Sequence, residues 1–192
     1  SKNSFYKIYL LGRKKILNYD YQYWDLNKTK INNNFLEETE IIFHFSSIAH
    51  TNESNKNKFY NKLYSLNYLG TIFLAKKIIN KNVKKFVFIS SIKSLDPDFR
   101  NLNIENLKSL KTKNIYGKIK RMTEIKLQEI FNNTDIKLYI LRLPLVYGPK
   151  VKGNLFYLNN YISKFPIVLL PKINNKKSLI HIDNLIQSIE YL

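Results

Sequence analysis

A serine pair, a tyrosine and a lysine in this chain have the residue types and spacing of a proton-transfer site. Ser90 and Ser91 close an apolar run, Tyr116 lies 25 residues after Ser91, and Lys120 follows Tyr116 by four positions. Residues four apart share one face of a helix, so the phenol and the ammonium would be neighbours. A free phenol with a pKa of about 10 is a poor base, and a nearby cation favours its phenolate form. The set could therefore move a proton at a substrate oxygen.

Each of these residues also has a structural interpretation. A serine pair that closes a strand is commonly a turn or a cap, and a tyrosine at a helix start is commonly packed. Chance alone would supply the tyrosine–lysine spacing in a chain with 14 tyrosines and 28 lysines, although Tyr116 is the only tyrosine that has it. The elements around the set must decide between the two interpretations.

Short apolar runs alternate with longer helical patterns along the chain. Nearly continuous apolar runs are typical of parallel strands buried on both faces. The predicted strands are Lys7–Gly12, Glu40–Ser46, Lys84–Ser91 and Lys137–Pro144, and the predicted helices are Asn55–Asn82 and Lys113–Asn132. The alternation predicts an α/β fold with a doubly wound parallel sheet in residues 1–148. Residues 149–192 are expected to begin a smaller substrate-binding part and a returning helix.

Composition limits the classes of protein that the chain can belong to. Its 192 residues are 44% apolar, which is enough for a buried core, and no apolar run is long enough to span a membrane. Cysteine is absent, and His44, His50 and His181 form no ligand cluster, so no metal site is expected. No signal peptide is visible in the sequence, and we expect a cytoplasmic location.

The net charge of +18 raises the question of nucleic-acid binding. The composition is skewed as a whole, with 28 lysines against 4 arginines and with 25 each of asparagine and isoleucine. The lysines are scattered and do not form one block. We therefore expect a diffusely basic surface and no specific nucleic-acid partner.

Five segments in a fixed order resemble one known family. They read EIIFHFSSIAH, LNYLGTIFLAKKIINKNVKKFVFISSIKS, YGKIK, LRLPLVYGPKVKGN and KKSLIHIDNL. Together they resemble the extended short-chain dehydrogenase/reductase family, the NAD-dependent sugar epimerase/dehydratase group. The resemblance implies a Rossmann-like fold, Tyr116 as the general acid/base, Lys120 as its partner and Ser91 as the hydroxyl that holds the reacting oxygen. Ser90 is a second candidate for that hydroxyl.

The resemblance also implies NAD or NADP as cofactor and a nucleotide sugar as substrate. The cofactor would contact Arg13, Asp25, Leu26, Phe45, Ser46, Ser47, Asn67, Tyr116, Lys120 and Leu143, and the substrate would contact Ser91, Asn154 and Lys177. Asp25 could instead be a turn or a helix cap, and Lys177 could simply be exposed. Arg13, with two lysines after it, stands where NAD-selective folds place a carboxylate, which favours NADP.

Two departures from the family pattern narrow the prediction. The 192 residues contain no Gly-x-x-Gly-x-x-Gly turn for the pyrophosphate, and we expect it upstream of Ser1, which would make the chain an inactive fragment that also lacks a C-terminal part. Ser91 is followed by Ile92 and Lys93, where the family's 4,6-dehydratases carry Asp-Glu. We therefore expect a 4-epimerase or 4-ketoreductase for a UDP-hexose or UDP-N-acetylhexosamine in polysaccharide synthesis, with a homodimer as a candidate assembly. The alternative is a non-catalytic relative that binds cofactor or RNA.

Overall fold

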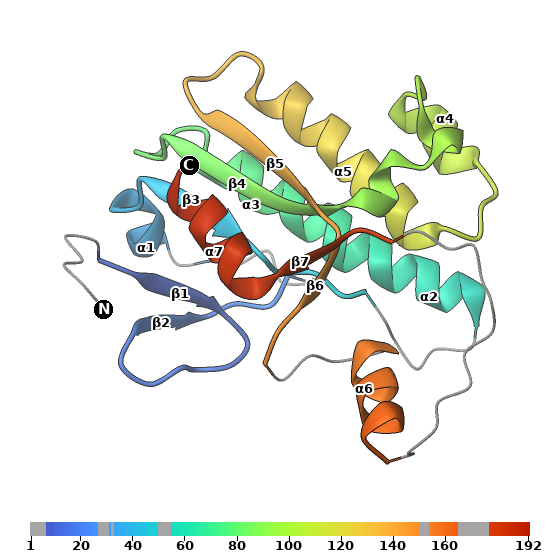
Figure 1. Ribbon diagram of the computed structural model, residues 1–192. Coiled ribbons are helices and arrows are strands. Elements are labelled where there is room, and N and C mark those ends of the chain that lie inside the picture. Colours follow the sequence, from blue (N-terminus) through green and yellow to red (C-terminus); the bar gives the residue numbers. More distant parts are fainter. Residues whose placement is uncertain (1–6, 27–30, 32, 50–54, 150–153, 165–176) are drawn as a thin grey trace. The chain divides into compact units, whose positions relative to one another are not determined.

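The computed structural model describes residues 7–26, 31, 33–49, 55–149, 154–164 and 177–192, in which strands and helices alternate (Figure 1). The strands are β1 (Tyr9–Gly12), β2 (Asp20–Tyr23), β3 (Ile41–His44), β4 (Lys85–Ser91), β5 (Lys137–Leu143), β6 (Leu145–Tyr147) and β7 (Leu179–His181). The α-helices are α1 (Asn33–Glu37), α2 (Lys56–Leu63), α3 (Gly70–Ile78), α4 (Ile104–Ser109), α5 (Ile115–Phe131), α6 (Asn154–Lys164) and α7 (Ile182–Glu190).

The strands pair in parallel, which confirms the expected α/β class. β1 pairs with β2, β3 pairs with β4, and β5 lies on the other side of β4. The pair β6–β7 is also parallel and belongs to a separate compact unit, residues 143–192, whereas residues 1–142 form the first unit. The chain thus divides six residues before the boundary predicted from the sequence, and each predicted strand contains an observed one.

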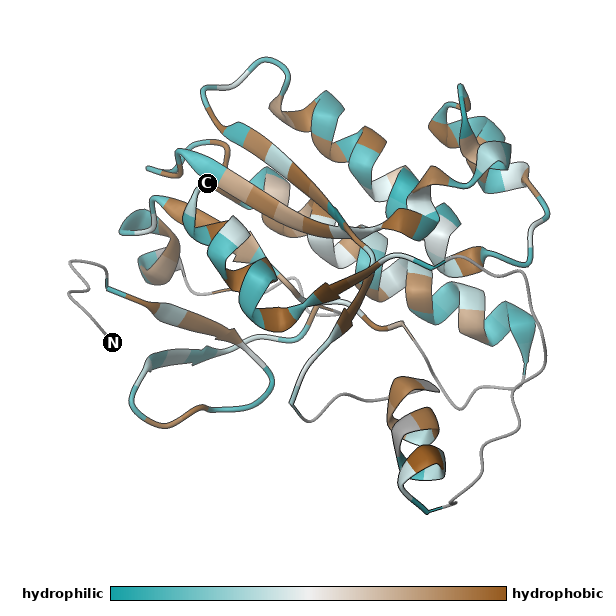
Figure 2. Cartoon of the chain, in the orientation of Figure 1, coloured by the Kyte–Doolittle hydropathy of each residue, from teal (hydrophilic) through white to brown (hydrophobic). Residues whose placement is uncertain are grey.

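A long helical rod and α5 cover one face of the β3–β4–β5 sheet (Figure 1). The rod runs through α2, a π-helical stretch (Tyr64–Leu69) and α3 without a break. Apolar residues dominate β4 and β5, whereas the helices carry apolar and polar stripes (Figure 2). The buried core that joins the helices to the sheet includes Leu63, Leu74, Ala75, Ile78, Phe86, Phe88, Ile119, Met122, Leu127 and Phe131.

Asparagine, which is abundant in this chain, begins several of the helices. Asn55 caps α2, Asn103 caps α4 and Asn114 caps α5, each through a side-chain oxygen that accepts a backbone N–H. Such caps satisfy N–H groups that have no partner within the helix. Asn18 and Asn101 adopt positive φ, which asparagine tolerates better than most residues. The asparagine-rich composition therefore serves helix starts and turns.

The first turn of α5 lies directly against the chain that follows β4. A Cβ atom added to Gly117 would lie 2.2 Å from the carbonyl oxygen of Lys93, too close for any side chain. Asn114 donates its side-chain N–H to that same oxygen at 3.1 Å. Glycine at position 117 therefore lets the end of β4 and the start of α5 meet, and this contact positions the candidate site.

We expect Gly117→Ala to lower the free energy of unfolding by about 1–3 kcal/mol, because the added methyl group forces the backbone apart. Alanine is otherwise the better helix former by about 1 kcal/mol, so a loss of stability would report the contact with Lys93. The control is Gly12→Ala, whose Cβ meets nothing within 4 Å. Urea denaturation of both variants makes the comparison, and equal stability would contradict the close approach.

Candidate active site

The end of β4 and the start of α5 carry the three predicted catalytic residues. Ser91 is the last residue of β4, Tyr116 is the second residue of α5, and Lys120 follows one turn later. Asn114 fixes the two segments to each other, because it donates to the Lys93 carbonyl and, at 2.8 Å, to Asp96. The structure thus places the serine and the tyrosine on segments that are held together.

The two serines at the end of β4 have different surroundings. Ser90 is buried and donates its proton to the Glu124 carboxylate at 2.5 Å. Ser91 is half-buried, and its oxygen accepts the N–H of Lys93 at 3.3 Å. A hydroxyl that accepts can still donate its own proton. The geometry therefore favours Ser91 over Ser90 as the hydroxyl that faces a ligand.

Lys120 is a buried cation beside the tyrosine ring. Its side-chain nitrogen donates to the carbonyl of Ile89 at 2.8 Å and lies 4.6 Å from the ring centroid of Phe88 and 5.8 Å from that of Tyr116. Burial lowers the pKa of Lys120 to about 8, and the negative charge of Glu124 opposes this change. Since an ammonium has three N–H groups, the bond to Ile89 leaves others for a ligand.

The pKa of Tyr116 differs from the sequence-based expectation. We expected the Lys120 ammonium and an oxidised nicotinamide to lower the pKa of the phenol; in the chain by itself burial of the side chain raises that pKa, and the nearby Ser47 hydroxyl only opposes the rise. The reason is that Lys120 faces the tyrosine ring and donates to the backbone of β4. In the chain by itself, Tyr116 is therefore a protonated phenol at neutral pH, the form that donates a proton.

Asn67 holds the loop that follows β3. It lies in the π-helical stretch and is almost completely buried. Its amide oxygen accepts the N–H of Ile48 at 2.9 Å, and its amide nitrogen donates to the carbonyl of Ile48 at 2.7 Å. These two bonds use one of the two amide N–H groups, so contact of Asn67 with the cofactor stays a prediction. Asn67 therefore fixes the shape of the loop that follows β3.

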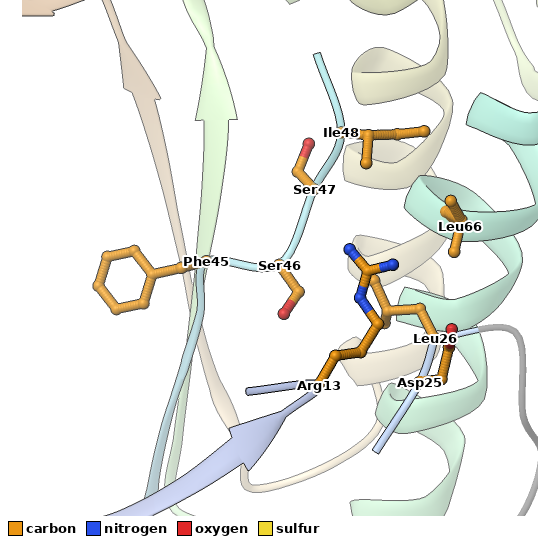
Figure 3. A pocket seen from close by; sticks show the side chains of 8 residues that line it. All are labelled: Arg13, Asp25, Leu26, Phe45, Ser46, Ser47, Ile48 and Leu66. Carbon is orange, nitrogen blue, oxygen red and sulfur yellow. The ribbon is translucent and has the colours of Figure 1, made fainter. Parts of the chain in front are cut away.

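A cavity of about 300 Å³ opens beside this loop (Figure 3). Six residues predicted to contact the cofactor line it together, with two that the prediction missed. They are Arg13, Asp25, Leu26, Phe45, Ser46 and Ser47, joined by Ile48 and Leu66. Figure 3 shows the Phe45 ring turned away from the other seven side chains, so Phe45 reaches the cavity mainly through its backbone. The two missed residues are ordinary apolar positions that no sequence signal distinguishes.

The cavity has the groups that a dinucleotide would need. Arg13 offers a cation and Asp25 a carboxylate on one rim. The buried Ser47 hydroxyl lies near the Tyr116 phenol but forms no hydrogen bond of regular geometry among the described residues. Because buried polar atoms are nearly always satisfied, an orphaned hydroxyl in a cavity wall suits a polar ligand. These residues fit the adenosine part of a nicotinamide cofactor.

The remaining predicted residues lie in the second unit. Leu143 is half-buried at the end of β5, Asn154 begins α6, and Lys177 is exposed shortly before β7. His181 ends β7 and caps α7, accepting the N–H of Asp183 at 3.3 Å. His50 falls outside the described residues.

Two absences hold for the part of the chain that the structure describes. It has no group of three or more histidine, aspartate or glutamate side chains that could hold a metal ion. Within the same part, no helix is both long enough and apolar enough to cross a membrane.

Comparison with known proteins identifies relatives. The model of the NAD-dependent epimerase/dehydratase family matches residues 6–192. A UDP-glucose 4-epimerase from Vibrio cholerae is 30% identical over 156 residues, which are 80% of this chain and 48% of that protein. A dTDP-D-glucose 4,6-dehydratase from Dictyostelium discoideum is 30% identical over 155 residues, 76% of this chain and 33% of that protein. The chain therefore spans about half or less of the length of these relatives.

Solved structures agree on the fold. The UDP-glucuronic acid 4-epimerase from Bacillus cereus in complex with NAD superposes with a TM-score of 0.74 at 18% identity. The match covers 98% of this chain and 66% of that one. At this level of identity the similarity shows the Rossmann-type fold, and the family match identifies the group.

We expect Asn67→Asp to lower the free energy of unfolding at pH 7 by roughly 2–4 kcal/mol, because a buried carboxylate would face the Ile48 carbonyl. Burial raises the pKa of such a carboxyl, and its protonated form could again donate to Ile48. Stability should therefore recover as the pH falls toward 4 and be lost as the pH rises through that pKa. Urea denaturation at both pH values tests this, with the exposed Asn61→Asp as control. A pH-independent loss equal in both variants would contradict the role of Asn67.

Proposed function

This chain belongs to the NAD-dependent epimerase/dehydratase family, and we propose that its protein is a nucleotide-sugar 4-epimerase or 4-ketoreductase. The observation that carries the proposal is the junction of β4 and α5. There, Ser91, Tyr116 and Lys120 lie on two segments that Asn114 and Gly117 hold in contact. A hydroxyl, a phenol and an ammonium at one strand end are the groups needed to move a proton at a sugar oxygen.

Each residue has a distinct task in the proposed reaction. The cofactor, when bound, supplies the acceptor and donor of hydride at the sugar carbon. Ser91 donates a hydrogen bond to the oxygen on that carbon, and Tyr116 gives or takes the proton of the same oxygen. Lys120 contributes the positive charge that favours the phenolate when Tyr116 must take the proton. The cavity lined by Arg13 and Asp25 would hold the adenosine of the cofactor.

The residues after Ser91 argue against dehydration. Removal of water from a sugar requires an additional acid and base near the reacting carbons. Ile92 is 42% exposed, and Lys93 places its ammonium 5.9 Å from the ring centroid of Tyr116. Neither side chain is a carboxylate. We therefore assign a single-carbon redox reaction, although one relative is named a dehydratase.

The proposed substrate is a UDP-hexose or UDP-N-acetylhexosamine for polysaccharide synthesis. The relatives named UDP-glucose 4-epimerase and UDP-glucuronic acid 4-epimerase support the UDP-sugar class. Asn154 and Lys177 would contact the diphosphate, since an amide and an ammonium both donate to phosphate oxygens. The cofactor is NAD or NADP: the family is NAD-dependent and the Bacillus cereus epimerase holds NAD, whereas Arg13 in the cavity wall is a cation that could pair with the 2′-phosphate of NADP.

In the intact protein, Tyr116→Phe should lower turnover of the UDP-sugar by roughly two to four orders of magnitude, the range of general acid/base catalysis. Cofactor binding should survive, because only the hydroxyl is removed. Tyr191→Phe is the control, since Tyr191 is 92% exposed. Steady-state kinetics and cofactor titration separate the two effects. Near-normal turnover of Tyr116→Phe would refute the proposed mechanism.

The same proposal predicts weak binding to nucleic acid despite the net charge of +18. At about 150 mM salt, the Kd for RNA or DNA should be no tighter than the non-specific range of about 10⁻⁴ to 10⁻⁶ M. A UDP-sugar should instead raise the melting temperature of the intact protein, as a ligand of the folded state does. Salt-resistant nanomolar binding to a defined RNA, with no protection by a UDP-sugar, would favour the non-catalytic alternative.

A further inference from the structure

Glu124 is a fully buried carboxylate below the candidate active site. Its side chain is completely inaccessible to solvent, and it lies one helical turn after Lys120 on α5. Burial would raise the pKa of the Glu124 carboxyl, but hydrogen bonds led by Arg142 outweigh burial and hold the pKa below its ordinary value. Glu124 is therefore an anion in the interior, which is a costly arrangement that needs compensation.

The compensation comes from four segments of the chain. Arg142 on β5 makes a two-pronged contact through Nε at 3.1 Å and Nη2 at 2.9 Å, and Arg121 on α5 adds Nη1 at 3.3 Å. Ser90 at the end of β4 and Ser94 just after it place their hydroxyls 2.5 and 2.7 Å from one carboxylate oxygen. The Glu124 carboxylate thus holds together β4, the turn after it, β5 and α5.

One of these contacts leads directly to Ser91. The hydroxyl of Ser94 lies 2.8 Å from the backbone carbonyl of Ser91 as well as 2.7 Å from Glu124. Its one proton is shared between these two acceptors, so Glu124 holds the turn in which Ser91 lies. Ser90, the neighbour of Ser91, is held by the same carboxylate.

The other connection leads to Lys120. The Lys120 ammonium is buried in the strand-facing side of α5, where its charge is disfavoured, and the Glu124 anion favours it. The charged and titratable groups that face this pair are Tyr116 and Arg121 on α5, His44 on β3 and Arg142 on β5. His44 is neutral at working pH because burial lowers its pKa to about 3. Glu124 is therefore the anion that balances Lys120.

We propose that Glu124 is a positioning residue for the reaction, holding the Ser91 turn through Ser90 and Ser94 and supporting the charge of Lys120. It touches neither substrate nor cofactor in this role, and the proposal rests on the proposed function of the Ser91, Tyr116 and Lys120 set. A merely structural ion pair would stabilise the fold but would leave the proton chemistry of Lys120 unchanged. The two roles therefore differ in a measurable way.

The test compares Glu124→Gln with Glu129→Gln in the intact protein. Glu129 lies on the exposed side of the same helix and pairs with Lys126 at 2.7 Å, so it controls for the substitution itself. We expect Glu124→Gln to lower kcat about 10- to 100-fold, as small displacements of catalytic groups do, with little change in KM. Removing the anion should also lower the pKa of Lys120, which is cationic only below that pKa. The alkaline loss of activity should therefore move to lower pH, and ¹⁵N NMR of the Lys120 side chain should show the same shift without turnover.

Ser94→Ala keeps the test decisive if Glu124→Gln does not fold. It preserves the ion pair of Glu124 with Arg142 and removes the hydroxyl that joins Glu124 to the Ser91 carbonyl, so kcat should fall about tenfold while the pH profile stays in place. Wild-type kcat in Ser94→Ala, or an unmoved Lys120 titration in a folded Glu124→Gln protein, would overturn the positioning role. Tyr116→Phe in the same assay separates the two proposals. If Tyr116→Phe is inactive while Ser94→Ala and Glu124→Gln are fully active, the positioning role is refuted and the proposed function stands. If Tyr116→Phe shows normal turnover, the proposed function is refuted.

Discussion

The carbonyl oxygen of Lys93 and the backbone of Gly117 lie so close that no side chain fits between them. This contact joins a strand end to a helix start that are 24 residues apart in the sequence. The placement of the catalytic residues depends on it, because Ser91 belongs to one segment and Tyr116 to the other. Asn114 adds a cap for the helix and a hydrogen bond to the same carbonyl, so the junction is fixed by shape and by polar contacts together.

Burial gives the groups at this junction their chemistry. The same low-polarity surroundings raise the pKa of the Tyr116 phenol and lower that of the Lys120 ammonium to about 8. The two pKa values move in opposite directions, but both shifts favour the neutral form of the group. In the chain by itself the phenol therefore keeps its proton, and Tyr116 can become a phenolate only where the positive charge of Lys120 is supported. The arrangement needs a nearby anion to keep the lysine charged, and Glu124 is in place to provide it.

The sequence predicts some parts of this molecule well, and the reason is local. The strand that ends in Ser91 is a run of apolar residues, and the helix that begins near Tyr116 has a clear apolar stripe, so both follow from periodicity. The family resemblance then locates Ser47 and Asp25 near a cofactor, and the structure brings both to one cavity. These residues are recognisable because each lies in a short sequence segment whose other residues also belong to the site.

Other parts follow only from tertiary contacts. Glu124 reads as one more charged residue on a helix, and its burial depends on Arg142 and on two serines from distant segments. Asn67, which we predict to contact the cofactor, also forms two hydrogen bonds with the backbone of Ile48, from a π-helical stretch that no sequence pattern predicts. A short strand such as β2 carries too few apolar residues to stand out. Periodicity predicts strands and helices, but it does not predict which side chains from distant segments contact each other.

The loop held by Asn67 shows how the cavity keeps its shape. His44 contacts the Thr71 hydroxyl at 2.8 Å, and that hydroxyl donates to the backbone carbonyl of Asn67 at 2.8 Å. Since the Thr71 proton is used for Asn67, the threonine oxygen must accept from His44, which fixes the histidine as the tautomer with its proton on Nε2. Because His44 has a pKa of about 3, this tautomer persists across the physiological range. The cavity wall is therefore supported by a buried chain of hydrogen bonds that exists without a ligand and does not change with pH in the physiological range. A site that is formed before the ligand arrives loses less binding energy to ordering.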